Sequence, residues 1–283
     1  MRRAGITENL GDVMMDTSTE PETICEGDPV LIIIDNKRRF IAEARPGAVI
    51  YTDRGAVPLG QAIGMPYGSR LPLPGGRSAV LLRPMLDDLL LIGYARRSQV
   101  IYPKDLGYMV LVGGVGPGTR VAEAGVGSGF LTSVLAYLVG DEGRVYGFDV
   151  REDMLRTARR NLSRAGLLER VELALHDVRE GIPVERVDAV FLDLPDPWNV
   201  VEHAYRVLRP SGRIVVFQPT VNQVEKTVAS MRRHGGFIDI RTVEILLREY
   251  IVEEGRTRPY TRMIGHTGFI TYARRALQPR EKK

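Results

Sequence analysis

The chain has one cysteine and no long apolar run among its 283 residues. Cys25 has no partner for an intrachain disulfide, and a metal site made of several thiolates from one chain is excluded. Apolar stretches such as 30–34 have the length of strands, whereas a membrane-spanning helix needs about 18 apolar residues. No apolar core follows the polar start of the chain, so no secretory signal is predicted. We therefore expect a cytoplasmic protein without a membrane partner.

Histidine is also scarce, and no two of the four histidines stand at metal-ligand spacing, so no metal site is predicted. The formal net charge is only +4, but its distribution is uneven. Residues 241–283 contain 10 Lys and Arg against 5 Asp and Glu, whereas residues 1–85 contain 10 of each. An excess of basic residues in one segment favours a polyanionic partner such as nucleic acid. A solvated surface would show the same excess.

Two patterns divide the chain. Up to about residue 85, short apolar runs alternate with turns such as Asp35-Asn-Lys-Arg38, which predicts a small β-barrel-like domain over residues 1–90. From about residue 91, strand patterns alternate with helical patterns, which predicts an α/β domain over residues 91–283 with a parallel sheet wound on both faces. We expect helices at 130–139, 151–165 and 221–234, and strands at 119–124, 144–149 and 187–194.

A glycine-rich turn follows the first strand of the second domain. It contains Gly125, Gly127 and Gly129, and it lacks the Gly-x-Gly-x-x-Gly spacing of dinucleotide sites because its third glycine comes one residue early. Glu123 lies two residues before the turn, and Asp149 ends the next strand, where a carboxylate accepts from the hydroxyls of a cofactor ribose. This combination favours S-adenosyl-L-methionine, with another nucleotide as the alternative.

Two further strands end in carboxylates. Asp177 follows the third strand, in the loop that faces the adenine of a cofactor in this topology, and Asp193 follows the fourth strand, where the substrate is met. Asp193 is followed by Leu-Pro-Asp-Pro-Trp198, which offers a carboxylate and an aromatic plate beside a methyl donor. We interpret Asp193 as the residue that holds an amine of a nitrogen substrate and takes up its proton. Tyr102, in a polar loop before a helix, could stack on a base or on the cofactor.

Four segments together resemble the TrmI family of tRNA (adenine-N1)-methyltransferases, in its archaeal branch. They are Arg97-Ser-Gln-Val-Ile-Tyr-Pro-Lys-Asp105, Glu123-Ala-Gly-Val-Gly-Ser-Gly-Phe-Leu131, His176-Asp-Val178 and Phe191-Leu-Asp-Leu-Pro-Asp-Pro-Trp198. A late stretch with Arg258-Pro, Met263 and His266-Thr267 is similar as well. The glycine turn alone is common to class I methyltransferases, whereas the first and last of the four segments are much more specific.

The resemblance implies a class I, Rossmann-like, S-adenosylmethionine-dependent fold behind a small N-terminal β-domain. It implies methylation of N1 of adenine 58 in the T-loop of tRNA by a homotetramer, and the archaeal branch extends this expectation to adenine 57. It makes Asp193 and Tyr102 the expected catalytic residues, and it leaves Met154 doubtful as a cofactor contact, with Arg151 as its replacement. Phe217 is the candidate for a second aromatic residue at the substrate. The expected cofactor-binding residues are Ile101, Glu123, Gly125, Gly127, Ser128, Gly129, Phe130, Leu131, Asp149, Met154, Asp177, Val178 and Asp193.

Two other functions remain open from the residues. A protein carboxyl methyltransferase of the isoaspartate-repair kind has a similar cofactor turn, but the loop after Asp193 argues against it. A tRNA-binding scaffold without chemistry would have no need of the four carboxylates at the strand ends.

Overall fold

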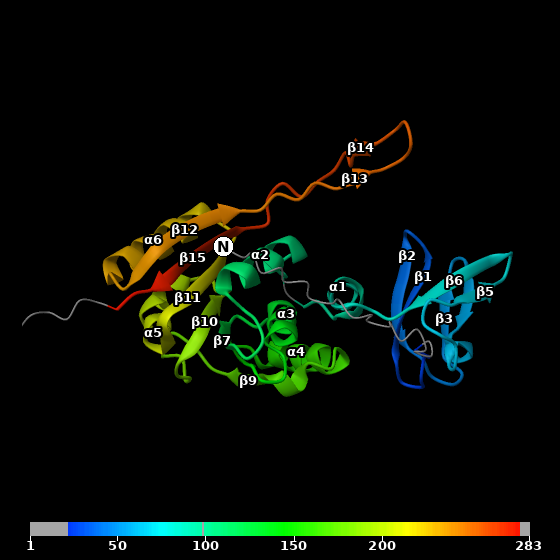
Figure 1. Cartoon of the computed structure of the whole chain (residues 1–283), viewed down its shortest axis with the longest axis horizontal. Helices are drawn as coiled ribbons and strands as arrows, with labels where there is room; N and C mark the ends of the chain where they lie inside the picture. Colours follow the sequence, from blue (N-terminus) through cyan, green and yellow to red (C-terminus); the bar gives the residue numbers. More distant parts are fainter. Residues whose placement is uncertain (1–21, 98, 278–283) are drawn as a thin grey trace, which may run out of the picture. The chain divides into compact units, whose positions relative to one another are not determined.

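The computed structural model describes residues 22–97 and 99–277. The chain divides into two compact units, residues 1–88 and 89–283 (Figure 1). Each unit has its own apolar core and is described by itself.

The described part of the first unit consists mainly of strands. They are β1 (Pro29–Asp35), β2 (Arg38–Glu43), β3 (Val49–Thr52), β4 (Gly55–Pro58), β5 (Arg70–Leu73) and β6 (Arg77–Leu82), with short helical turns η1 (Leu59–Ala62) and α1 (Leu86–Asp88). Four of the strands form an antiparallel sheet in the order β2-β1-β6-β5, and β3 pairs with β4 in a separate ribbon. The strands therefore surround one core without a continuous ladder that would close them into a single barrel.

Alternating side chains of these strands fill that core. Val30, Ile32, Val57 and Leu81 are fully buried, together with Leu59 of η1. Burying such a side chain stabilises the fold by about 1.5–3 kcal/mol. The apolar residues that suggested short strands in the sequence are the ones that fill this core.

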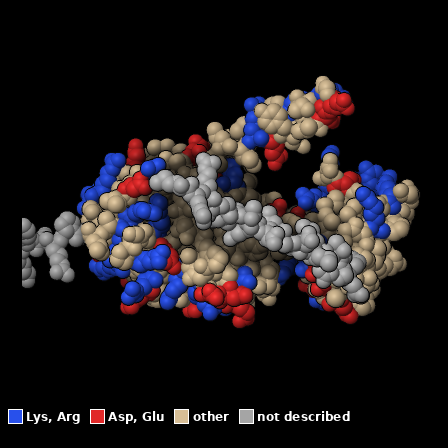
Figure 2. Space-filling model, in the orientation of Figure 1, with Lys and Arg blue, Asp and Glu red and all other residues tan. Residues whose placement is uncertain are grey.

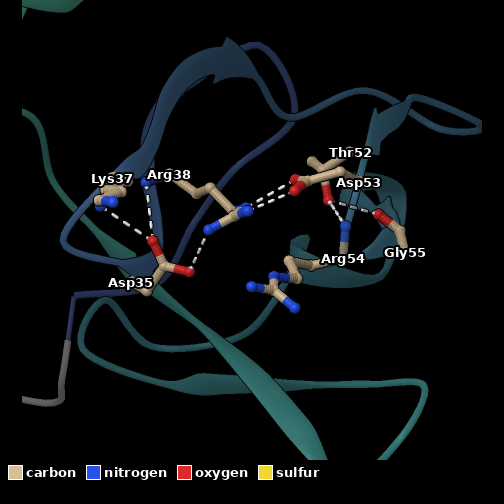
Figure 3. A network of polar contacts seen from close by, with 7 residues as sticks. All are labelled: Asp35, Lys37, Arg38, Thr52, Asp53, Arg54 and Gly55. Atoms are coloured by element: carbon tan, nitrogen blue, oxygen red, sulfur yellow. Dashed lines mark hydrogen bonds and ion pairs between the residues drawn. The ribbon is translucent and has the colours of Figure 1, made fainter.

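Arg38 ties two turns of the first unit together (Figure 3). Its Nη1 donates to Oδ2 of Asp35 at 2.7 Å, and its Nε donates to Oδ1 of Asp53 at 2.6 Å. The hydrogen bonds from Arg38 lower the pKa of Asp53 to about 2. The turn after β1 is closed by the N–H groups of Lys37 and Arg38, which donate to Oδ1 of Asp35 at 2.9 and 3.0 Å.

The second unit is built on a seven-stranded sheet in the order β12-β15-β11-β10-β7-β8-β9. Five strands, β11, β10, β7, β8 and β9, are parallel, whereas β15 runs antiparallel to both β11 and β12. The predicted parallel sheet is therefore mixed at this edge, where β12 turns back into β15 without a crossover helix. The strands are β7 (Arg120–Ala124), β8 (Arg144–Asp149), β9 (Val171–Leu175), β10 (Val187–Leu192), β11 (Leu208–Gln218), β12 (Phe237–Glu244) and β15 (Phe269–Arg275).

Helices cover both faces of this sheet (Figure 1). They are η2 (Leu89–Gly93), α2 (Pro103–Gly113), α3 (Phe130–Val139), α4 (Glu152–Arg164), η3 (Leu168–Arg170), η4 (Pro197–Asn199), α5 (Val201–Val207) and α6 (Val221–His234). Val201, Ala204 and Met231 bring α5 and α6 onto one face, and Leu155 and Ala158 bring α4 against the glycine turn on the other. No helix among the described residues is long and apolar enough to cross a membrane.

Local signals fix several helix ends. Thr220 and Gln223 form a capping box at the start of α6, and Gly235 ends it at φ 74° in the left-handed region that glycine adopts without strain. Pro103 occupies the first position of α2, where its missing N–H costs no hydrogen bond.

A small hairpin between β12 and β15 was not predicted. Its strands, β13 (Tyr250–Ile251) and β14 (Arg258–Pro259), pair antiparallel over two residues each. We refer to residues 245–268, which contain this hairpin, as the arm. Strands this short carry no alternating pattern that sequence inspection can detect.

Candidate active site

The glycine turn joins β7 to α3 with backbone conformations that favour glycine. Gly125, Gly127 and Gly129 have φ values of 90°, 53° and 83°. A β-carbon on Gly125 would lie 2.1 Å from the backbone carbonyl oxygen of Asp193, and one on Gly129 would lie 3.1 Å from Cβ of Ala158. The turn therefore combines left-handed conformations with a close approach to the loop after β10, and both require glycine.

Asp149 at the end of β8 holds the turn in place. Its Oδ2 accepts the N–H of Gly127 at 2.9 Å, and its Oδ1 accepts the N–H of Arg151 at 2.9 Å. The side chain is buried, with 8% of the residue exposed. Each carboxylate oxygen retains lone pairs, so both remain able to accept from ribose hydroxyls.

Glu123 is the most unusual group of the site. The residue is 1% exposed, and neither carboxylate oxygen has a hydrogen-bond partner among the described residues. Burial raises the pKa of Glu123 to about 8; the nearby Thr132 opposes this effect, and the negative charges of Asp193 and Asp149 add to it. A buried carboxyl without a donor is costly, which indicates that its hydrogen-bond partner is a ligand.

Asp193 directly follows β10, and its N–H donates to the carbonyl of Ala124 at 2.9 Å. The residue is half-buried. Burial raises the pKa of Asp193 to about 7, and the negative charge of Asp149 contributes in the same direction. No described residue donates a hydrogen bond to its carboxylate. A carboxyl that titrates near neutrality can both accept a hydrogen bond and take up a proton.

Two adjoining pockets lie along the carboxyl ends of the parallel strands, and Gly125 and Asp149 line both. The first pocket is lined on one side by Asp177 and Val178 and on the other by the loop after Asp193. The second pocket is lined by three carboxylates, those of Glu123, Asp149 and Asp193. The other predicted residues in its lining are Ile101, Gly127, Ser128, Phe130 and Leu131. The sheet thus brings most of the predicted site residues together.

Asp177, predicted at the adenine, is already engaged by a basic residue. Nε of Arg179 lies 2.9 and 3.0 Å from the two carboxylate oxygens of Asp177, and Nη2 lies 2.6 Å from Oδ2. These hydrogen bonds lower the pKa of Asp177 to about 2. Asp177 is therefore a charged acceptor at every pH of interest.

Five predicted residues lie outside the lining of both pockets, and Gly129 of the glycine turn is one of them. Tyr102 is half-buried at the start of α2, where its carbonyl accepts the N–H groups of residues 105 and 106. Met154 is buried in α4, whereas Arg151 does line the second pocket. Phe217 is buried against Gly268 at the end of β11. Trp198 lies against α6, with Nζ of Lys226 4.7 Å from the centre of its ring.

The residues that follow Tyr102 have a structural role. Nζ of Lys104 lies 2.8 Å from Oδ1 of Asp105, 2.7 Å from the carbonyl oxygen of Ile245 and 2.6 Å from Oγ1 of Thr267. Thr267 donates to Oδ2 of Asp105 at 2.7 Å. The Lys104 and Asp105 side chains are 8% and 0% exposed. This interior cluster fastens the start of α2 to both ends of the arm.

Several pocket residues were not predicted. The segment before α2 contributes Gln99 and Val100 to the second pocket, and the loops after β9 and β10 contribute Arg179 and Asp196 to the first. For Arg179 and Asp196, the position in a loop at a strand end was a usable signal, since ligands in open α/β sheets bind at that edge. Among the described residues, no group of three His, Cys, Asp or Glu side chains could hold a metal ion.

The residues present fit the predicted cofactor. The orphaned carboxyl of Glu123 suits a cationic amino group, Asp149 suits a ribose, and Asp177 suits an exocyclic amine. The glycine turn would let the backbone approach the ligand closely. No pyrophosphate cradle is needed for S-adenosylmethionine, in keeping with the absence of the dinucleotide spacing.

Comparison with known proteins agrees with this geometry. The model of a protein family described as tRNA methyltransferase complex GCD14 subunit matches residues 80–257. The tRNA (adenine(57)-N(1)/adenine(58)-N(1))-methyltransferase TrmI of Methanocaldococcus jannaschii is 38% identical over 76% of this chain and 85% of that protein. The tRNA (adenine(58)-N(1))-methyltransferase catalytic subunit TRM61 of Cryptococcus neoformans is 33% identical over 91% of this chain, which spans 60% of that longer protein.

Two solved structures are similar over nearly the whole chain. A Thermotoga maritima protein described as a SAM-dependent O-methyltransferase has a TM-score of 0.86 and 32% identity, covering 92% of this chain and 97% of that one. The tRNA (m1A58) methyltransferase TrmI of Aquifex aeolicus has a TM-score of 0.80 and 29% identity, covering 91% and 100%.

The fold and the site define a class I, Rossmann-like, S-adenosylmethionine-dependent methyltransferase with an N-terminal β-domain. The chain belongs to the family of the tRNA methyltransferase complex GCD14 subunit, and the resemblance to TrmI is confirmed.

Proposed function

We propose that this protein transfers a methyl group from S-adenosylmethionine to N1 of adenine 58 in the T-loop of tRNA. The names of the relatives that match most of the chain support this activity. The name of the Methanocaldococcus relative extends the proposal to adenine 57. The observation that carries the proposal is the position of Asp193 in the pocket that Glu123 and the glycine turn also line.

When bound, S-adenosylmethionine supplies a methyl group carried on a positively charged sulfur. Asp193 accepts a hydrogen bond from the exocyclic amine of the target adenine and so aims N1 at that methyl group. The cofactor would supply the methyl group for a new bond to N1, and the electron pair of the sulfur–methyl bond would remain on sulfur. The adenine becomes positively charged, and Asp193 stabilises this charge and can take up a proton from the amine.

A base in a folded tRNA loop reaches such a pocket only after it leaves its stack. The half-buried Asp193 reads the amine edge once the base has entered. Positioning and exclusion of water supply most of the acceleration in this proposal. Tyr102 could still brace the base, although it lies outside the lining of the pockets.

Each part of the cofactor is assigned to residues of this chain. Glu123 holds the ammonium of the amino-acid end, Asp149 the ribose hydroxyls, and Asp177 the adenine amine. Ile101, Phe130 and Val178 are buried apolar groups of the lining that exclude water. Arg151, rather than Met154, is the proposed contact after β8, because only Arg151 lines the pocket.

We also propose that the protein acts as a homotetramer in the cytoplasm. The arm supports an assembly, because it exposes large apolar side chains that a partner would cover. They include Leu246, Leu247, Tyr250, Val252 and Met263, of which Val252 is 79% exposed. Light scattering during size-exclusion chromatography should give four times the mass of one chain. A monomer at micromolar concentration would contradict the assembly without affecting the chemistry.

A tRNA transcript and labelled S-adenosylmethionine test the activity directly. We expect 1-methyladenosine at position 58, found by nucleoside mass spectrometry and a reverse-transcription stop, and no product from a transcript with guanine at 58. Aged protein serves as the alternative acceptor and should remain unlabelled. A 2′-O-methylated nucleoside, in line with the name of the Thermotoga protein, would overturn the proposed site of methylation.

A further inference from the structure

Arg179 bridges two loops that belong to different parts of the site. It follows β9 and lines the first pocket between Asp177 and Asp196. Its Nε and Nη2 bind Asp177 at 2.6–3.0 Å, and its Nη1 lies 3.5 Å from Oδ2 of Asp196. One guanidinium therefore connects the loop at the expected adenine with the loop that carries Asp193.

The loop on the Asp196 side is held on its other flank. Oδ2 of Asp196 also accepts from Nδ2 of Asn199 at 2.9 Å, and the carbonyl of Pro195 accepts from Nε2 of Gln223 in α6 at 2.9 Å. Asp193 stands only three residues before Asp196. A change in the ion pair between Arg179 and Asp196 therefore acts on a short segment. Proline stiffens this segment, and it leads back to the catalytic carboxylate of Asp193.

We propose that Arg179 is a positioning residue that couples occupancy of the adenine subsite to the placement of Asp193. The proposal rests on the proposed function, since it deepens the account of the same site. Both oxygens of Asp177 already accept from Arg179, so an adenine amine that binds Asp177 competes with the guanidinium. The released donors then strengthen the contact with Asp196. Cofactor binding thereby fixes the position of the loop after β10, which carries Asp193 and receives the target base.

Stability of the fold does not account for this arrangement. The Arg179, Asp177 and Asp196 side chains are 53%, 28% and 23% exposed. Exposed ion pairs contribute little to stability, because solvent screens them and ordering the side chains costs entropy. A variant of Arg179 should therefore fold normally, and its effects should be confined to the site.

The first experiment measures cofactor affinity by calorimetry with S-adenosylmethionine and no tRNA. We expect Arg179→Gln to tighten binding about tenfold, because the amine of the cofactor no longer competes with the guanidinium for the oxygens of Asp177. Arg179→Lys should be intermediate, because it keeps the charge without the planar fork. Arg156→Gln is the matched control, since Arg156 is also exposed and pairs with Glu152 at 2.9 Å outside both pockets. Affinity of Arg179→Gln within twofold of the unmodified protein would overturn the role of Arg179 in cofactor binding.

The second experiment is a double-mutant cycle on kcat at saturating cofactor. If Arg179 acts through Asp196, then Arg179→Gln, Asp196→Asn and the double variant should lose similar amounts of kcat. Additive losses would overturn the coupling between the two loops. The calorimetric experiment needs no RNA, so it can give the expected result even if the methylated nucleotide is not the proposed one. A failed proposal of function therefore remains distinguishable from a failed role of Arg179.

Discussion

The backbone of Gly125 lies against the carbonyl oxygen of Asp193, so closely that a β-carbon at residue 125 would lie 2.1 Å from that oxygen. The N–H of Asp193 in turn donates to the carbonyl of Ala124 at 2.9 Å. No side chain separates the glycine turn, the proposed site of the methyl donor, from the loop after β10, the proposed site of the acceptor. A methyl group needs this proximity, since reacting atoms must come within about 3–3.5 Å.

Gly125→Ala should therefore damage both halves of the reaction. The new methyl group must displace the start of the loop after β10, and the residue must keep a φ of 90° that side chains disfavour. We expect a loss of about 2–4 kcal/mol in the free energy of unfolding, from overpacking and from backbone strain. Urea titration measures the stability, and calorimetry with S-adenosylmethionine should show strongly weakened binding.

Gly140→Ala provides the matched comparison. Gly140 has a φ of 66°, but no atom lies within 4 Å of the position its β-carbon would take. This variant should lose about 1–3 kcal/mol from strain, because its ψ of −168° lies in a region that is almost restricted to glycine, and it should bind the cofactor normally. Equal effects of the two substitutions would show that the contact with Asp193 is unimportant.

The orphaned carboxyl of Glu123 predicts a pH dependence of stability. Its pKa is about 8 in the folded protein, against an ordinary value of 4.5. Between these values the folded state holds more protons than the unfolded state, so the free energy of unfolding falls as pH rises through this window. Glu123→Gln should flatten the fall between pH 5 and 8. Thermal melts of both proteins at several pH values measure the difference.

The same carboxyl predicts that cofactor binding releases a proton. Glu123 is mostly protonated at pH 7, whereas its proposed role with the cofactor's ammonium requires the charged form. The observed binding enthalpy should therefore change between buffers of different ionisation enthalpy, and Glu123→Gln should abolish this change and weaken binding. Proton release that persists unchanged in the variant would assign it to another group.

Asp193 should control turnover rather than cofactor binding. Asp193→Ala should lower kcat by about 10²–10⁴, the usual contribution of a positioned acid or base, while S-adenosylmethionine still binds. Because the pKa of Asp193 is about 7, kcat of the unmodified enzyme should rise with pH through neutrality, and Asp193→Asn should lose that rise. Near-normal methylation by Asp193→Ala would exclude the assignment.

Sequence patterns predicted the sheet and most of the pocket for identifiable reasons. The helices at 130–139 and 221–234 and the strand at 144–149 match the structure because periodicity, glycines and caps mark their ends. The residues at the carboxyl ends of parallel strands converge by topology alone, which is why Glu123, Asp149 and Asp193 could be placed together.

Side-chain direction and contacts between distant loops were beyond sequence reasoning. The side chain of Trp198 was expected beside the methyl donor, yet it packs on Lys226, 28 positions away in the chain. The Arg179 contact with Asp196 depends on how two loops meet in space, which no local pattern encodes. The Lys104 cluster is similar, because its partner Thr267 is separated from it by 163 positions.

The interior pair of Lys104 and Asp105 should be essential for stability. Lys104→Met would leave the fully buried Asp105 carboxylate without its counter-charge, and such a loss costs about 3–5 kcal/mol. It would also free the carbonyl of Ile245, so limited proteolysis should cut within the arm more rapidly. Replacing both residues by apolar ones should recover part of the stability. An unchanged urea midpoint for Lys104→Met would rule out this role.

The arm also offers the sharpest test of how tRNA is held. It contains Arg248, Arg256, Arg258 and Arg262 together with three glutamates, so its charge is more balanced than the sequence totals suggested, and Figure 2 shows both signs on it. Arg256 pairs with Glu253 at 2.8 Å, whereas no described residue forms an ion pair with Arg258 or Arg262. In the first unit, Arg38 is likewise paired with two carboxylates, those of Asp35 and Asp53.

We therefore expect Arg258→Gln and Arg262→Gln each to weaken tRNA binding and to reduce the salt slope of the affinity by about 1, as the loss of one phosphate contact predicts. Arg256→Gln should have a smaller effect, because its charge is already compensated by Glu253. Filter binding between 50 and 200 mM salt, at concentrations that keep the assembly intact, measures all three. A chain that lacks residues 1–85 tests the alternative that the first unit makes the tRNA contacts. If that deletion lowers the affinity and the slope more than the arm variants do, the contacts lie in the first unit and the proposed role of the arm is wrong.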